Sequence, residues 1–66
     1  MQVKINGKSE EFPGGSVLDL LKTKKIEPQM VAVEVNDTMV DREHLDSTPL
    51  KEGDGLEFLF YMGGGT

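Results

Sequence analysis

The chain has 66 residues, a net charge of −5 and no cysteine. A chain of this length forms one domain at most and buries only about 60% of the surface that its unfolded form exposes, so a deep substrate cleft beside the core is disfavoured. Without cysteine there is no disulfide framework and no thiolate metal site. With one histidine, any metal site would depend on carboxylates, and we expect none.

The acidic balance argues against a nucleic-acid partner, because phosphates require clusters of lysine and arginine. It either favours a partner with a basic docking surface or serves only solubility. The first residues lack the apolar segment of a signal peptide, and no stretch approaches the roughly 20 apolar residues of a membrane span. We therefore expect a cytoplasmic protein with no membrane partner.

The chain opens with the pattern of a β-hairpin. Val3 and Ile5 alternate with polar residues, as in a strand with one buried side. Asn6-Gly7 follows, and this pair is a strong hairpin signal because both positions accept a positive φ. Residues 8–12 then form the returning strand.

A helix of about three turns is expected next. Ser16 is a suitable N-cap, with Asp19 three residues later, where a carboxylate favours the helix dipole. Lysines close the helix, and Pro28 prevents its continuation. The Gly14-Gly15-Ser16 start could bind an anion, but it lacks the spacing of a phosphate loop, so a capped loop is favoured. The apolar stripe of the helix consists of Val17, Leu20 and Leu21.

The second half of the chain predicts three strands and one turn. Residues 31–35 alternate as a half-buried strand, and residues 39–40 form a short further strand. Residues 41–47 are a loop or a single helical turn anchored by Leu45. The last strand runs from residue 56 to about residue 62. One helix across a mixed sheet of four to five strands, with the first and last strands able to pair, is the β-grasp arrangement, an α+β class.

The last strand divides its side chains between two faces. Phe58 and Phe60 share a face with Leu56, and we expect this face to pack under the helix. Leu59 and Tyr61 then point to solvent, directly before the end of the chain. We interpret them as a partner docking patch; the alternative is that scattered exposed apolar residues are ordinary.

After the β-grasp domain of residues 1–62, residues 63–66 are expected to form a flexible tail. Its three glycines, Gly63, Gly64 and Gly65, have no side chain to pack and a high entropy of ordering. Such a tail is thin enough to thread a narrow channel into a partner's active site. The alternatives are a frayed terminus or the remnant of an expression tag.

The whole chain resembles the ThiS family, the β-grasp sulfur carriers of thiamin thiazole synthesis. The residues that carry the resemblance are Val3 and Ile5, Ser16-Val17, Leu20-Leu21, residues 31–36, Val40 with Arg42-Glu43, Gly53-Asp54 and the diglycine Gly64-Gly65.

The resemblance implies a carrier rather than an enzyme. A ThiF-like adenylyltransferase, using ATP and Mg²⁺, would adenylate the carboxylate of Gly65. A persulfide donor would then displace AMP and leave a thiocarboxylate, whose sulfur passes to a ThiG-like thiazole synthase. Gly63 and Gly64 would give clearance for threading. The chain itself would hold no cofactor and no catalytic residue.

Thr66 departs from the family, which ends on the second glycine. A β-branched residue is bulky and stiff, and it moves the reactive carboxylate off glycine. We therefore expect a peptidase to remove Thr66. Two alternatives remain: a MoaD-like carrier for pterin (molybdenum or tungsten) cofactor synthesis, and a ubiquitin-like protein modifier or binding module.

One further cluster lies in the 41–47 turn. His44 stands among Asp41, Glu43 and Asp46 and could act as a general base. No nucleophile constellation surrounds it in the sequence, so a surface histidine in a charged turn is favoured.

Overall fold

The computed structural model describes residues 1–61. Within them no helix is long and apolar enough to cross a bilayer. The elements are β1 (Gln2–Ile5), β2 (Lys8–Glu11), α1 (Val17–Thr23), the 3₁₀ turn η1 (Pro28–Met30), β3 (Val31–Val35), β4 (Thr38–Val40), the 3₁₀ segment η2 (Arg42–Ser47) and β5 (Gly55–Phe60).

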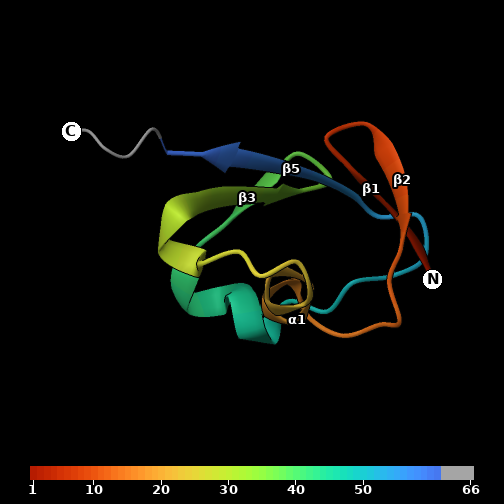
Figure 1. Cartoon of the computed structure of the whole chain (residues 1–66), viewed down its shortest axis with the longest axis horizontal. Coiled ribbons are helices and arrows are strands. Elements are labelled where there is room, and N and C mark those ends of the chain that lie inside the picture. Colours follow the sequence, from red (N-terminus) through yellow and green to blue (C-terminus); the bar gives the residue numbers. More distant parts are fainter. Residues whose placement is uncertain (62–66) are drawn as a thin grey trace.

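The strands form one five-stranded sheet in the order β2-β1-β5-β3-β4. β1 and β5 are parallel, and the other neighbours are antiparallel. The helix α1 lies against one face of the sheet, and β5, the central strand of the sheet, runs towards the edge of the molecule (Figure 1). This arrangement confirms the β-grasp prediction and puts the C-terminal strand between the two halves of the sheet.

The opening hairpin forms as the Asn-Gly pair predicts. Asn6 and Gly7 have φ values of 50° and 85°, in the left-handed region that asparagine and glycine tolerate. The two strands then pair in the register Ile5↔Lys8 and Val3↔Glu10.

The helix starts at the predicted cap. The backbone N–H of Asp19 donates to the Ser16 hydroxyl, and the backbone N–H of Ser16 donates to the Asp19 carboxylate. This capping box satisfies two N–H groups that have no partner within the helix. The hydrogen bonds from the Ser16 backbone and hydroxyl keep the pKa of Asp19 below its ordinary value.

The helix is shorter than predicted. It has seven residues, about two turns rather than three. Lys25 adopts φ 60°, and the backbone N–H of Ile26 donates to the Leu21 carbonyl at 2.9 Å. This left-handed reversal ends the helix and lets Ile26 pack against the core. The positive φ falls on a lysine, so no glycine marked this end in the sequence.

The core lies between α1 and the covered face of the sheet. β5 contributes Leu56 and Phe58, both almost fully buried. The prediction that Phe60 packs with them is wrong, because its side chain is 54% exposed. Phe60 is the last residue of β5 and pairs with Val31, the first residue of β3, so its side chain lies at the margin of the core. The buried apolar residues are Val3, Ile5, Phe12, Val17, Leu20, Leu21, Val31, Val33, Leu45, Leu50, Leu56 and Phe58.

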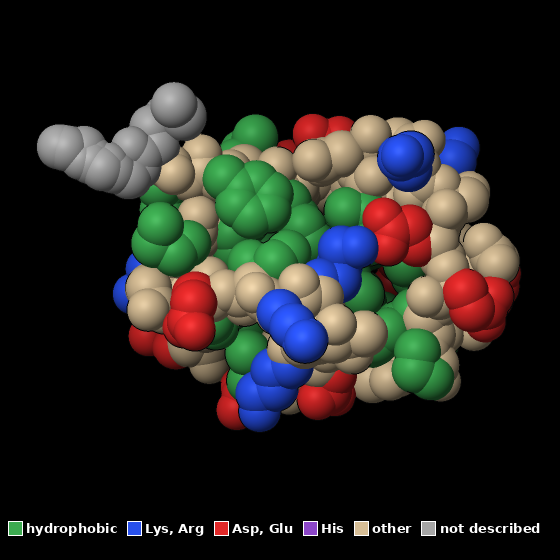
Figure 2. All heavy atoms as spheres, viewed as in Figure 1, with side chains coloured by type: hydrophobic (Ala, Val, Ile, Leu, Met, Phe, Trp, Pro, Cys, Tyr) green, Lys and Arg blue, Asp and Glu red, His purple; other side chains and the backbone are tan. Residues whose placement is uncertain are grey.

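Hydrophobic side chains therefore reach the surface between the sheet and the helix. Figure 2 shows them gathered in the middle of this face, below the C-terminal end of β5, with lysine, arginine and acidic side chains around them. The ring of Phe60 packs against that of Phe58 in a T-shaped pair with centroids 6.3 Å apart.

Candidate functional site at the end of the last strand

The first half of β5 is held on its β1 side by backbone hydrogen bonds. The N–H of Lys4 donates to the Asp54 carbonyl, and the N–H of Asn6 donates to the Leu56 carbonyl, both at 2.9 Å. β1 ends at Ile5, so backbone pairing on this side ends with it.

The Asn6 side chain extends this pairing by one step. Its Oδ1 accepts the N–H of Phe58 at 2.8 Å, and its Nδ2 donates to the Phe58 carbonyl at 3.3 Å. The side-chain amide thus takes the place that the next peptide group of β1 would have taken. It fixes Phe58, the last residue of β5 that reaches the core.

A second asparagine fixes the start of β5. Asn36 Oδ1 accepts the N–H of Gly55 at 3.0 Å, and Asn36 Nδ2 donates to Asp54 Oδ1 at 3.1 Å. The other carboxylate oxygen, Asp54 Oδ2, accepts the N–H of Lys51 at 2.7 Å. The bond from Gly55 orients the Asn36 amide, so its NH₂ group faces the carboxylate.

Asp54 is the one charged residue buried among residues 1–61, with 6% of its surface exposed. Burial acts to raise its pKa. The hydrogen bonds from the Lys51 backbone and the Asn36 amide, together with the Lys51 charge, outweigh burial and bring the pKa of Asp54 below its ordinary value. The carboxylate therefore stays ionised and ties the turn before β5 to the turn after β3.

Sequence reasoning missed these positioning roles. Asn6 and Asn36 are turn residues in the sequence, and the turn chemistry alone predicts a positive φ, which both have. Nothing in the local pattern shows that their amides reach across to a strand about 20 or 50 residues away in the chain. Sequence analysis used Asp54 only as part of the Gly53-Asp54 match to the family and assigned it no structural role.

The second half of β5 is exposed on both faces. Leu59 and Tyr61 are 49% and 55% exposed, as the alternation of the strand predicts, and Phe60 joins them from the other face. The N–H of Tyr61 donates to the Met30 carbonyl at 3.1 Å. The chain is thus held against the start of β3 as far as the last described residue.

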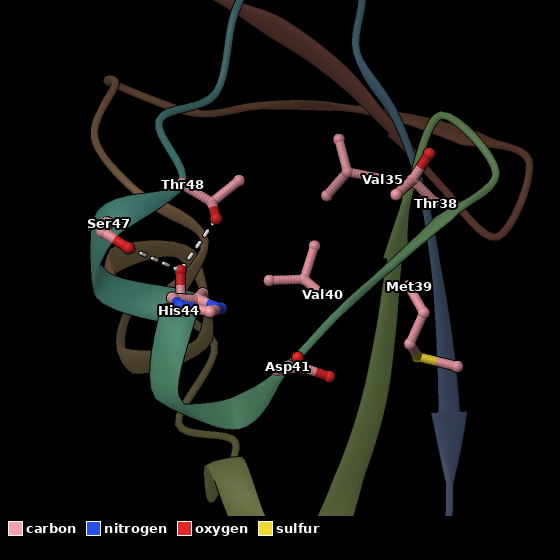
Figure 3. Close-up of a pocket in the computed structure, with 8 residues that line it drawn as sticks. All are labelled: Val35, Thr38, Met39, Val40, Asp41, His44, Ser47 and Thr48. Carbon is pink, nitrogen blue, oxygen red and sulfur yellow. Dashed lines mark hydrogen bonds between the residues drawn. The ribbon is translucent and has the colours of Figure 1, made fainter.

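The sheet face away from the helix carries a cluster of apolar side chains, which we call the outer patch. Ala32 lies directly opposite Leu59, and Met39 lies opposite Glu34, the next outward residue of β3 after Ala32. In Figure 3 Met39 points to the opposite side of β4 from Val40, which faces the helical side. The outer patch consists of Ala32, Met39, Leu59 and Tyr61.

The predicted reactive segment follows this patch directly. Gly63, Gly64, Gly65 and Thr66 lie outside the described residues, so the threading and sulfur-bearing roles stay predictions. β5 brings the chain to the edge of the molecule immediately before them (Figure 1).

The cluster around His44 borders a separate surface cavity of about 390 Å³ between β4 and η2. Val35 and Val40 point towards η2, and the hydroxyls of Ser47 and Thr48 both donate to the His44 backbone carbonyl (Figure 3). These hydroxyls are therefore occupied by the backbone.

On the η2 turn itself, Asp41, Glu43 and His44 bring ligand atoms within 4.8 Å of one another. All three side chains are exposed and come from one 3₁₀ turn. Exposed groups of this kind are common on surfaces without an ion, and the neighbouring Ser47 and Thr48 hydroxyls bind the His44 backbone carbonyl rather than its imidazole.

A mixed five-stranded sheet of the order β2-β1-β5-β3-β4 with one main helix packed across it is the β-grasp fold of the ubiquitin-like class of proteins. Comparison with known families gives the particular family. The ThiS family matches residues 3–65, and the chain therefore belongs to the ThiS family. The match confirms the resemblance seen in the sequence.

Two solved structures agree with this assignment. The crystal structure of the thiamine biosynthesis protein (ThiS) from Geobacter metallireducens is 38% identical, covers 98% of this chain and all of its own, and has a TM-score of 0.84. An NMR solution structure of a thiamine biosynthesis protein from the same organism is 37% identical. That comparison covers all of this chain and 90% of the other, with a TM-score of 0.80. No curated protein matches the chain significantly.

Proposed function

We propose that this protein is a sulfur carrier of thiamin thiazole biosynthesis and not itself an enzyme. The observation that carries the proposal is the course of β5. The strand is fixed at its first half, exposes apolar side chains at its second half and is separated from Gly63-Gly64-Gly65 by two residues in the sequence. Membership of the ThiS family and the likeness to two thiamine biosynthesis proteins support the pathway.

The chemistry takes place at the carboxylate of Gly65. A ThiF-like adenylyltransferase binds ATP and Mg²⁺, and the Gly65 carboxylate oxygen attacks the α-phosphorus of ATP. The products are an acyl-adenylate and pyrophosphate. The sulfur of a persulfide donor then attacks the acyl carbon and releases AMP. A thiol cleaves the resulting S–S bond and leaves the thiocarboxylate, whose sulfur is transferred to a ThiG-like thiazole synthase.

The residues of this chain bind and position rather than catalyse. The outer patch docks on the partner, and Leu59 and Tyr61 are its members nearest the tail. Gly63 and Gly64 lack side chains, so they fit a channel that would reject larger residues. ATP and Mg²⁺ belong to the activating partner. We expect the cycle to run in the cytoplasm, where ATP is available.

Thr66 has to be removed before activation in this scheme, because its presence puts the terminal carboxylate on the wrong residue. A processing peptidase that cleaves after Gly65 would expose the reactive end. Mass spectrometry of the protein isolated from its native cell tests this step. A sulfur-charged species that retains Thr66 would refute it.

The proposed function is tested with three chains, ending at Gly63, Gly65 and Thr66. Each is incubated with ATP, Mg²⁺, the ThiF-like adenylyltransferase and a persulfide source, and its intact mass is measured. The chain ending at Gly65 should gain the mass of one sulfur in exchange for one oxygen, and the other two should not. Absence of this gain on the Gly65 chain would contradict the proposal. High-mass conjugates in its place would indicate a protein modifier.

A further inference from the structure

Two glutamates face each other on the outer face of the sheet. Glu34 on β3 and Glu57 on β5 are directly opposite in the antiparallel register. Side chains in this position have Cβ atoms only about 5 Å apart, and like charges there destabilise the pair of strands. The pair lies in the centre of the sheet, where β3 and β5 are neighbours.

Neither glutamate of this pair has an ion-pair partner within residues 1–61. The two ion pairs formed there join Lys24 to Glu10 and the N-terminal amine to Glu11. Neither Glu34 nor Glu57 forms an ion pair or a side-chain hydrogen bond within the same residues. Lys4 is the nearest cationic residue by register, since its strand partner is Gly55, and it borders the same shallow hollow as Glu57 without forming an ion pair. The sheet thus sets two acidic side chains opposite each other without an ion pair, in a protein that already carries a charge of −5.

The position of the pair connects it to the outer patch. Glu57 precedes Leu59 by two residues on the same face of β5, and Glu34 follows Ala32 by two residues on β3. Met39 lies directly opposite Glu34 on its other side. Glu34 is half-buried between these neighbours. A partner that covers the apolar side chains would therefore also cover the two carboxylates and exclude water from them.

We infer that the Glu34–Glu57 pair receives a guanidinium or ammonium group of the activating enzyme that docks on the outer patch. This inference rests on the proposed function, because it takes the adenylyltransferase as the docking protein. A cation between the two carboxylates relieves their repulsion and gains two charge-assisted hydrogen bonds. Arginine matches two neighbouring carboxylates with its planar set of donors. The pair then determines which enzyme binds, and the apolar side chains supply the contact area.

The test compares two variants with equal changes in charge. Glu34→Gln/Glu57→Gln removes the pair, and Glu43→Gln/Asp46→Asn removes two exposed acidic groups from η2. Chains ending at Gly65 are titrated with the ThiF-like adenylyltransferase by calorimetry at low and high salt. For the first variant we expect Kd to rise by about tenfold or more at low salt, with a weaker salt dependence. The control should stay within about twofold of the unsubstituted chain, because its charges lie away from the interface.

Urea unfolding of the same variants separates docking from a structural role. Removal of the repulsion should leave the urea midpoint of Glu34→Gln/Glu57→Gln unchanged or raise it. A lowered midpoint, or a Kd equal to that of the control variant, would overturn the inference. In either case sulfur gain on the unsubstituted Gly65 chain would leave the proposed function intact. If that chain gains no sulfur, the result contradicts the proposed function itself.

Discussion

The two halves of β5 differ in their hydrogen bonding to neighbouring strands and in the exposure of their side chains. Residues 55–58 are bonded on both sides, by β3 and by β1 with the Asn6 amide, and they bury Leu56 and Phe58 in the core. In the second half Leu59 and Phe60, and Tyr61 directly after the strand, are each about half exposed. On the β1 side, the described residues give this half no strand partner.

This difference separates stability from recognition along a single strand. The first half fixes the strand in the sheet, and the second half presents side chains on both faces next to the tail. A carrier needs both, because a tail that enters an active site has to start from a fixed point while partners dock beside it. Substitutions in the first half should therefore unfold the protein, and substitutions in the second half should not.

The sharpest test of this contrast uses two phenylalanines on the same face of β5. Phe58→Ala removes a ring that is 5% exposed, and we expect a loss of about 3–5 kcal/mol in the free energy of unfolding. A domain of this size has little stability to lose, so the variant should be largely unfolded. Circular dichroism with urea titration measures the change.

Phe60→Ala is the matched variant, because it deletes the same ring two residues later. Its ring is mostly exposed, and the contact with Phe58 contributes about 1 kcal/mol. We expect a folded protein that loses no more than this. Equal losses for the two variants would show that the two halves of β5 do not differ in stability as the exposures indicate.

A smaller effect is expected at Asp54, which ties the start of β5 to Asn36. Both carboxylate oxygens of Asp54 accept a hydrogen bond, one from the Asn36 amide and one from the Lys51 N–H. In Asp54→Asn an NH₂ group replaces one of these oxygens and therefore faces one of the two donors. We expect a loss of about 1.5–3 kcal/mol at neutral pH, as for a buried hydrogen bond to a charged group. Urea titration of both proteins gives the difference.

The pH dependence checks the cause of this loss. The pKa of Asp54 is lower in the folded state than its ordinary value. Its contribution to stability is therefore complete above the unfolded-state pKa of about 3.9 and disappears as the pH falls through the folded-state pKa. The gap between the two proteins should narrow as the pH falls below about 4. The pKa of Asp19 is lowered too, so both measurements are made in an Asp19→Asn background. A gap that stays constant down to pH 2 would contradict the role given to the carboxylate.

Local rules in the sequence predicted most of the fold. The Asn6-Gly7 hairpin, the Ser16 cap and the alternation of β3 depend on neighbours in the chain, and the structure has all three. The alternation of β5 also predicted correctly that Leu59 and Tyr61 are exposed. Each of these features is decided within a few residues.

Features that depend on contacts between distant segments could not be predicted in this way. The early end of α1 at the left-handed Lys25 is marked by no glycine, and the exposure of Phe60 depends on where the core ends along β5. The hydrogen bonds of Asn6 to Phe58 and the opposition of Glu34 and Glu57 depend on strand order and register. Alternation along one strand assigns a face, but it does not identify the residue opposite.

The smallest effect on stability, and the one that tests the docking role, is expected at the outer patch. Leu59→Ala/Tyr61→Ala removes two half-exposed side chains, so the free energy of unfolding should change by no more than about 1 kcal/mol. The affinity for the ThiF-like adenylyltransferase should nevertheless fall, because large apolar side chains covered by a partner contribute most of the binding energy. Phe60→Ala is the control: it is on the same strand and equally exposed, but on the opposite face. A loss of affinity confined to Leu59→Ala/Tyr61→Ala would assign docking to the outer face. An equal loss for Phe60→Ala would mean that the enzyme encloses both faces of the strand, and unchanged affinity in both variants would exclude this half of β5 from docking.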